Sequence, residues 1–123
     1  MKKQVDSIVV NGIEYIPKGS VTLKAESLDG MPFVIVRTYS AGVYFGWLKE
    51  EKKDECILAN ARNVWYWKGA ATLLQMAVDG VNSPDECKFS KTVSQIKLKN
   101  VIAIIECTKE AQDNLTSVKI WEE

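Results

Sequence analysis

Runs of β-branched and aromatic residues, broken by short polar or glycine-containing segments, dominate the middle of the chain. They predict an antiparallel meander of four strands, over residues 33–39, 43–48, 56–59 and 63–67. Further on, residues 93–98 alternate between apolar and polar side chains with a period of two, and the apolar residues 101–107 are typical of a buried strand. Residues 118–121 favour an edge strand.

One segment, over residues 70–78, has the period of a helix instead. Its apolar side chains recur on one helical face at Leu73, Leu74, Ala77 and Val78. Gly80 is a typical residue to end this helix, and Thr108 is a suitable N-cap for a second, short helix. Within the strands, Gly46 predicts a bulge or a close approach of two backbones. The charged residues 49–55 predict a solvent-exposed hairpin loop.

Two short β-rich runs near the N-terminus flank Asn11 and Gly12, a pair that accepts positive φ at both central positions of a tight turn. This predicts a β-hairpin. Because an isolated hairpin is only marginally stable in water, it must pack on the main domain or on a second copy, and we expect a homo-oligomer. Residues 1–30 therefore form the hairpin and its connector, and residues 31–123 form the main domain. The expected fold is α+β, mainly an antiparallel β meander or roll, with one principal helix over about residues 70–78.

Charge and composition limit the function. The 123 residues contain 16 lysines and arginines and 16 aspartates and glutamates, so the net charge is zero. A protein that binds duplex nucleic acid needs a basic surface, so we expect no such partner. The absence of histidine excludes Ser-His-Asp and Cys-His catalysis and every metal site that uses histidine.

The three cysteines, Cys56, Cys87 and Cys107, are widely spaced and form no C-x-x-C pair. Each lies beside apolar residues, so they predict free, reduced cysteines in the core of a cytosolic protein and no zinc site. No apolar stretch is long enough for a signal peptide or a membrane span. The acidic residues show no spacing typical of general acid–base catalysis, and we expect neither an enzyme nor a cofactor.

Two stretches carry a family resemblance: residues 32–43, which contain the sequence RTYSAGV, and residues 60–71, NARNVWYWKGAA. Together with residues 86–89 and 106–108, they resemble a family of small bacteriophage and prophage proteins of uncharacterised function. The N-terminal sequence NGIEYIPK is similar to a hairpin found on assorted small phage proteins. The resemblance covers roughly residues 8–121 and implies a protein that acts in the cytoplasm of a bacterial host. Asn63 stands where the family often has a second arginine, which weakens any anion site built on paired arginines.

The candidate ligand-binding residues combine the two arginines of the chain with its densest aromatic cluster. A guanidinium binds phosphate or carboxylate through a planar fork, tryptophans on one face of a strand stack on bases, and a small-residue turn can present backbone N–H groups to an anion. The alternatives are arginines paired with carboxylates on polar strand faces, tryptophans in the core or a subunit interface, and an ordinary turn. The set is Arg37, Tyr39, Ser40, Arg62, Trp65, Trp67 and Lys68.

Two functions fit these observations. The first is a non-enzymatic phage accessory protein that counters host defence by binding and sequestering a small phosphorylated or nucleotide signal, or a host defence protein. Sequestration needs affinity and no turnover, so the missing catalytic base is no obstacle. The second is a virion-associated structural protein, such as a capsid decoration or head accessory protein. Neither function involves a membrane partner.

Overall fold

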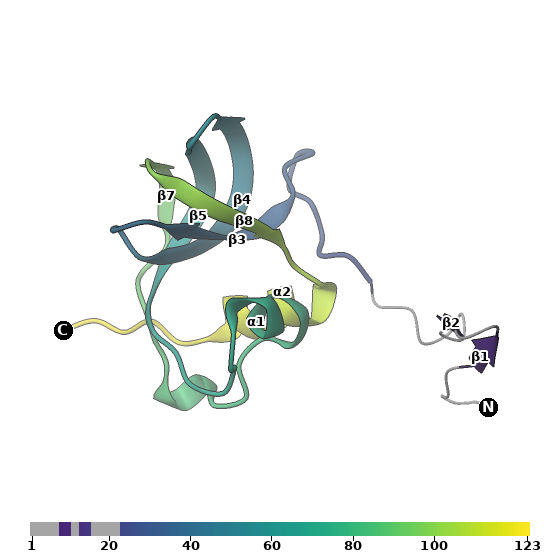
Figure 1. Cartoon of the computed structure of the whole chain (residues 1–123). Coiled ribbons are helices and arrows are strands. Elements are labelled where there is room, and N and C mark those ends of the chain that lie inside the picture. Colours follow the sequence, from purple (N-terminus) through teal and green to yellow (C-terminus); the bar gives the residue numbers. More distant parts are fainter. Residues whose placement is uncertain (1–7, 11–12, 16–22) are drawn as a thin grey trace.

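The computed structural model describes residues 8–10, 13–15 and 23–123. Strands β1 (Ile8–Val10) and β2 (Ile13–Tyr15) pair antiparallel, with Val10 opposite Ile13, which confirms the N-terminal hairpin. The turn predicted at Asn11 and Gly12 lies outside the described residues, as does the part of the connector at residues 16–22. The rest of the chain has an α+β fold, with a mostly antiparallel six-stranded sheet and two helices (Figure 1).

The sheet has the strand order β6-β5-β4-β3-β8, and β7 also pairs with β5. Its strands are β3 (Phe33–Thr38), β4 (Val43–Lys52), β5 (Glu55–Tyr66), β6 (Lys88–Phe89), β7 (Val93–Leu98) and β8 (Val101–Glu106). The short β6 pairs with the end of β5 at Val64 and Tyr66, whereas β7 pairs with its first half, from Cys56 to Ala61. One edge of β5 therefore carries two different strands.

The sequence predicted two strands where the structure has the single strand β5, and this expectation is corrected. Asn60 adopts a positive φ of 49°, and Gly46 on β4 lies where the register shifts by an extra residue on β5. A Cβ atom on Gly46 would lie 2.9 Å from the carbonyl oxygen of Ala59, which confirms the predicted bulge and close approach. The strand bends at the bulge and continues, so the meander is β3–β4–β5.

The charged segment 49–55, expected to be a loop, is also mainly strand. β4 runs to Lys52, β5 begins at Glu55, and Lys53 takes the positive φ of the turn between them. The polar side chains of this hairpin extend into solvent beyond the core. The charged residues therefore favoured a loop in the sequence, although they form the paired ends of β4 and β5.

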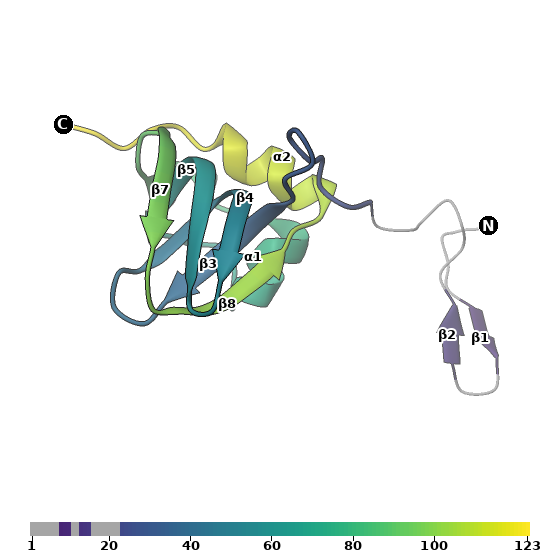
Figure 2. The ribbon, with the colours of Figure 1, turned by 90° about the horizontal axis from the view of Figure 1, so that it is seen from above.

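Both faces of β3 are buried, because the sheet bends so that β3 and β8 run obliquely to β4, β5 and β7 (Figure 2). Phe33 and Ile35 belong to a core cluster shared with the helices, together with Phe45, Phe89, Met76 and Leu115. Val34 and Val36 belong to a second cluster between the strands, with Cys56, Leu58, Ala61 and Leu98. The bent sheet therefore encloses the second cluster between its strands, and it carries the first cluster on the face that packs against the helices.

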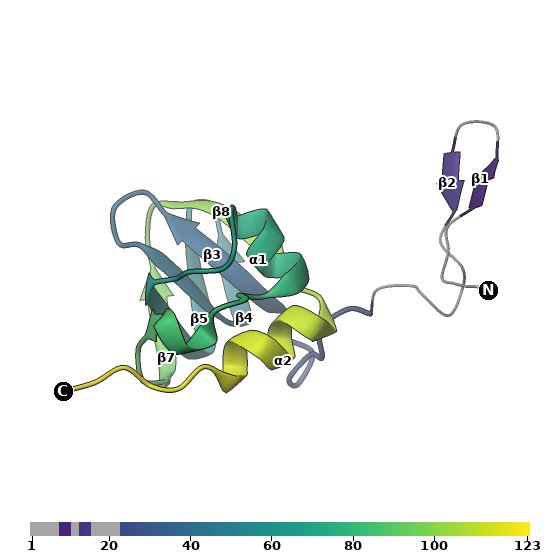
Figure 3. The same ribbon diagram turned by 90° about the horizontal axis from the view of Figure 1, so that it is seen from below.

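Both helices, α1 (Leu73–Asp79) and α2 (Lys109–Ser117), lie on the same side of the sheet (Figure 3). α1 ends at Gly80, whose N–H donates to the carbonyl of Met76 at 2.9 Å, as predicted. Thr108 caps α2 by accepting from the N–H of Ala111 at 3.0 Å. α2 has nine residues and α1 has seven, so the helix that was expected to be short is the longer of the two. α2 is polar except for a narrow buried stripe, and its apolar period is therefore weak in the sequence.

The segment 118–121 forms no strand but an isolated parallel bridge between Ile120 and Phe89, because only one backbone pair matches there. On α1, two of the four residues expected on the apolar face, Leu74 and Val78, are exposed. Ala77 is buried as expected, Leu73 packs half-buried against the core, and Met76 is buried as well. All three cysteines are buried and free, as expected. In the part of the chain described by the structure, no helix is long and apolar enough to cross a membrane.

Candidate functional site

Arg62 lies in β5 and is buried, with only 6% of its surface exposed. Its Nε donates to the carbonyl oxygen of Ser90 at 2.8 Å, and its Nη1 donates to that of Val118 at 2.8 Å. Its Nη2 donates to the carbonyl oxygens of Phe89 at 3.5 Å and Lys119 at 3.4 Å. The guanidinium therefore joins β5, the β6–β7 connection and the C-terminal segment.

Carbonyl groups and aromatic rings surround the Arg62 guanidinium. Its Cζ atom lies 5.9 Å from the centre of the Phe45 ring and 5.6 Å from that of Phe89. Burial lowers the pKa of Arg62, but its ordinary value is so high that the group stays charged. Among the described residues it forms no ion pair. Both alternatives drawn from the sequence, an anion-binding fork and a pairing with a carboxylate, are thus replaced by a structural role.

Arg37, Tyr39 and Ser40 are exposed at the end of β3 and in the loop that follows it. Arg37 lies opposite Val43 on β4, which in turn lies opposite Val64 on β5. Arg37 and the aromatic end of β5 therefore occupy the same end of the sheet, two strands or about 10 Å apart. The structure does not bring the two arginines together as a pair facing solvent.

The β3–β4 loop satisfies much of its own hydrogen bonding. Thr38 Oγ1 accepts from the N–H of Ala41 at 2.8 Å and donates to the carbonyl oxygen of Gly42 at 2.9 Å. The N–H of Tyr39 donates to the carbonyl oxygen of Asn100 at 2.9 Å. Two of the N–H groups that an anion-binding loop would need are therefore already engaged, and the geometry is that of an ordinary turn.

Trp65 and Trp67 do not share a face, because β5 has an irregularity between Val64 and Tyr66 and ends at Tyr66. Trp67 is half-buried against the larger core cluster, and its Nε1 donates to the carbonyl oxygen of Ala70 at 3.2 Å. Trp65 is exposed over 66% of its surface. Only one of the two tryptophans is therefore available to a partner.

Trp65 stacks on Trp121, with ring centres 6.3 Å apart and an interplanar angle of 11°. Lys88 Nζ lies 5.3 Å from the centre of the Trp121 ring, within the range of a cation–π interaction. We call Trp65, Trp121 and Lys88 the aromatic platform. The N–H of Trp121 donates to the carbonyl oxygen of Phe89 at 2.9 Å, which fixes the C-terminal segment beside β6.

Lys88 and Trp121 were not among the predicted site residues. They come from β6 and from the segment after α2, and only the tertiary fold brings them to the end of β5. The one available signal was the edge strand expected over residues 118–121, which placed Trp121 at the sheet without naming its neighbour. Lys68, which was predicted, pairs with Glu86 at 3.0 Å, and this hydrogen bond raises the pKa of the lysine.

A hollow of about 390 Å³ lies beside the platform. It is lined by Asp85, Glu86, Cys87, Lys88, Lys119, Ile120, Trp121 and Glu122. Three carboxylates therefore face two ammonium groups, and Glu122 also pairs with Lys91 at 3.1 Å. A lining with this balance of charge does not favour a phosphate group.

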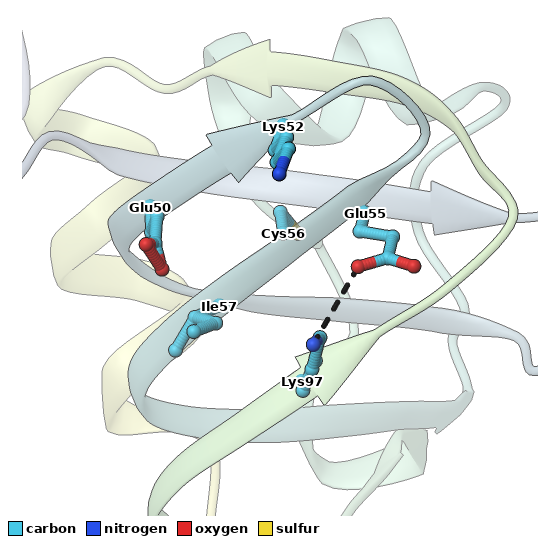
Figure 4. A pocket seen from close by; sticks show the side chains of 6 residues that line it. All are labelled: Glu50, Lys52, Glu55, Cys56, Ile57 and Lys97. Atoms are coloured by element: carbon cyan, nitrogen blue, oxygen red, sulfur yellow. Dashed lines mark ion pairs between the residues drawn. The ribbon is translucent and has the colours of Figure 1, made fainter.

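A second hollow, of about 250 Å³, lies on the β4–β5 hairpin, where Lys97 pairs with Glu55 at 3.5 Å (Figure 4). Cys56 also lines it, but burial raises the pKa of this thiol, so it is a poor nucleophile near neutral pH. Nowhere in residues 23–123 do three or more Cys, Asp or Glu side chains gather as a metal site would require.

The fold and the platform together define an α+β protein with an exposed aromatic surface. The chain belongs to the family described as Domain of unknown function (DUF6948), whose match spans residues 31–115 and so covers more than half of it. Neither the curated proteins nor the solved structures gave a significant match.

Proposed function

We propose that this protein is a non-catalytic phage accessory protein that acts in the cytoplasm of a bacterial host and counters a host defence by binding. The exposed, stacked pair of Trp65 and Trp121 carries this proposal. Stacked indole rings in solvent leave apolar area exposed to water. Tryptophan is among the residues most enriched at the centres of protein interfaces.

A host protein fits this surface better than a nucleotide does. A sequestered nucleotide needs cationic groups for its phosphates and a site that encloses most of its surface. Arg62 is engaged by four carbonyl groups, and the hollow beside the platform carries more carboxylates than lysines. A protein partner needs only a complementary apolar surface with a mixed-charge rim, and the platform has both.

The experiment compares Trp65→Ala with Leu74→Ala, since both side chains are 66% exposed and Leu74 lies on α1, away from the platform. Each variant is expressed in a bacterial host that carries the defence system. That host is then infected with a phage from which the gene for this protein has been deleted. We expect Trp65→Ala to lose the rescue of phage plating and Leu74→Ala to keep it. Equal rescue by both variants would overturn the role of the platform.

Two further measurements address the other candidate functions. Titration of the purified chain with ATP, AMP and a cyclic dinucleotide, followed by tryptophan fluorescence, is expected to show no saturable change. A micromolar dissociation constant would replace the protein partner with a nucleotide. Mass spectrometry of purified virions is expected to find no stoichiometric copies. Many copies per particle would identify a capsid decoration or head accessory protein and end the counter-defence proposal.

A further inference from the structure

β8 is an edge strand whose sequence resembles that of a central strand. Within the described residues it pairs only with β3, and no other backbone segment pairs with residues 102–106 (Figure 2). Every second residue of such a strand directs its N–H and C=O groups away from its neighbour. Five of its six residues are apolar, and it contains neither proline nor lysine, the usual protections of an edge.

A comparison with β3 shows what β8 lacks. Phe33 to Val36 on β3 are each at most 1% exposed, because β3 has a neighbouring strand on both sides. The equally apolar β8 has no fully buried residue, and Ile102 is 55% exposed. Ile102 lies at the bulge between β3 and β8, so it projects beyond the regular pairing. A strand added on the outer side would cover this apolar row.

We propose that β8 pairs with β8 of a second copy of this chain, antiparallel and about a two-fold axis, to form a homodimer. A two-fold axis perpendicular to a continuous sheet sets each residue opposite one that points to the same face. With the axis at Ala103, Ile102 lies opposite Ile104 of the other copy, and Glu106 lies opposite Asn100, the neighbour of Lys99. The apolar centre of β8 in one copy then pairs with the apolar centre of β8 in the other.

Charge at the two ends of β8 indicates a second copy as the partner. Lys99 precedes the strand and Glu106 ends it, both are exposed, and neither forms an ion pair with another described residue. An antiparallel copy brings the basic start of each strand beside the acidic end of the other, so the complementary contact occurs twice. This dimer is independent of the aromatic platform and of the function proposed for it.

The test is sedimentation velocity on the full chain. We expect a reversible dimer, and we expect Ile102→Lys to raise its dissociation constant at least about tenfold. Leu74→Lys, at a comparably exposed position on α1, is the matched control and should leave dimerisation unchanged. Far-UV circular dichroism and thermal unfolding establish that each variant is folded. A monomeric wild type, or an equal response to both substitutions, would contradict the proposal.

Charge reversal tests the antiparallel arrangement itself. Lys99→Glu alone and Glu106→Lys alone should each weaken the homodimer, because each places like charges together twice. An equimolar mixture of the two variants should dimerise about as well as wild type, since every contact in the mixed dimer then joins opposite charges. If the mixture remains as weak as its components, β8 is not paired in this way.

Discussion

The Nη1 atom of Arg62 donates a 2.8 Å hydrogen bond to the carbonyl oxygen of Val118, 56 residues further along the chain. Through this contact and the one to Lys119, a buried guanidinium holds the C-terminal segment that carries Trp121. The exposed platform therefore depends on a side chain that no partner can reach. The position of the proposed binding surface and the stability of the fold therefore depend on the same residue.

Replacing Arg62 with methionine removes these bonds and leaves buried carbonyl groups without a donor. We expect a loss of about 2–4 kcal/mol in the free energy of unfolding, measured by urea denaturation. The near-UV circular dichroism of the stacked tryptophans should fall as well. Arg37→Met is the control, since Arg37 is exposed and its loss should cost less than about 0.5 kcal/mol. Equal costs for the two variants would refute the structural role of Arg62.

Gly46→Ala should destabilise the sheet at the bulge. The added Cβ would lie 2.9 Å from the carbonyl oxygen of Ala59 and 3.1 Å from the Cα of Ala61, and neither backbone atom can move freely. We expect a cost of about 1–3 kcal/mol from chemical denaturation. Gly30→Ala is the comparison, because its Cβ meets nothing within 4 Å and only the positive φ of 81° costs energy, about 1 kcal/mol. A smaller loss for Gly46→Ala would contradict the close approach.

Gln112→Leu should release the segment that leads into β3. The Gln112 amide accepts from the N–H of Glu26 at 2.8 Å and donates to the Glu26 carbonyl oxygen at 2.9 Å. We expect a loss of about 1–3 kcal/mol, together with faster hydrogen exchange at Glu26. Asp113→Ala removes only the exposed ion pair with Lys109 and should cost about 0.3–0.5 kcal/mol. Unchanged exchange at Glu26 in the leucine variant would count against the contact.

The stability of the protein should fall at alkaline pH through Cys107. Burial raises the pKa of its thiol to about 12 from 9.0. The unfolded chain therefore releases this proton at lower pH than the folded chain. The contribution of the protonated thiol to the free energy of unfolding is complete below pH 9 and is lost as the pH rises toward 12. At pH 10 the loss is about 1.4 kcal/mol.

The measurement is urea denaturation at pH 8 and pH 10, on wild type and on Cys107→Ala. The alanine variant is expected to lose less stability between the two pH values, although it starts from a lower one. Lysine deprotonation affects both proteins alike, so it cancels in the comparison. An identical pH dependence in the two proteins would show that the thiol ionises normally in the folded state.

Local chemistry made much of the fold predictable. The bulge at Gly46, the helix end at Gly80 and the cap at Thr108 each follow from one residue's backbone preference or side-chain reach. The joining of two expected strands into β5 was not predictable in this way. Asn60 looks like a break in the sequence, and only pairing with β4 on one side and β7 on the other keeps the strand continuous.

The candidate site was less predictable than the fold. Of the predicted cluster, Trp65 is exposed, but Arg62 and Trp67 turn inward where the strand bends and ends. Trp121 and Lys88 complete the platform from distant parts of the chain. These contacts join residues that are far apart in the sequence. They depend on how α2 and β6 pack, which no local hydrophobic periodicity predicts.

The position of β3 between β4 and β8 has a consequence for folding during synthesis. One neighbour of this central strand follows it immediately, whereas the other emerges only with residues 101–106. Until then, one edge of β3 and the apolar side chains of Phe33 and Ile35 remain open to other chains on the polysome. The nascent chain should therefore need a chaperone most between the completion of β5 and the arrival of α2.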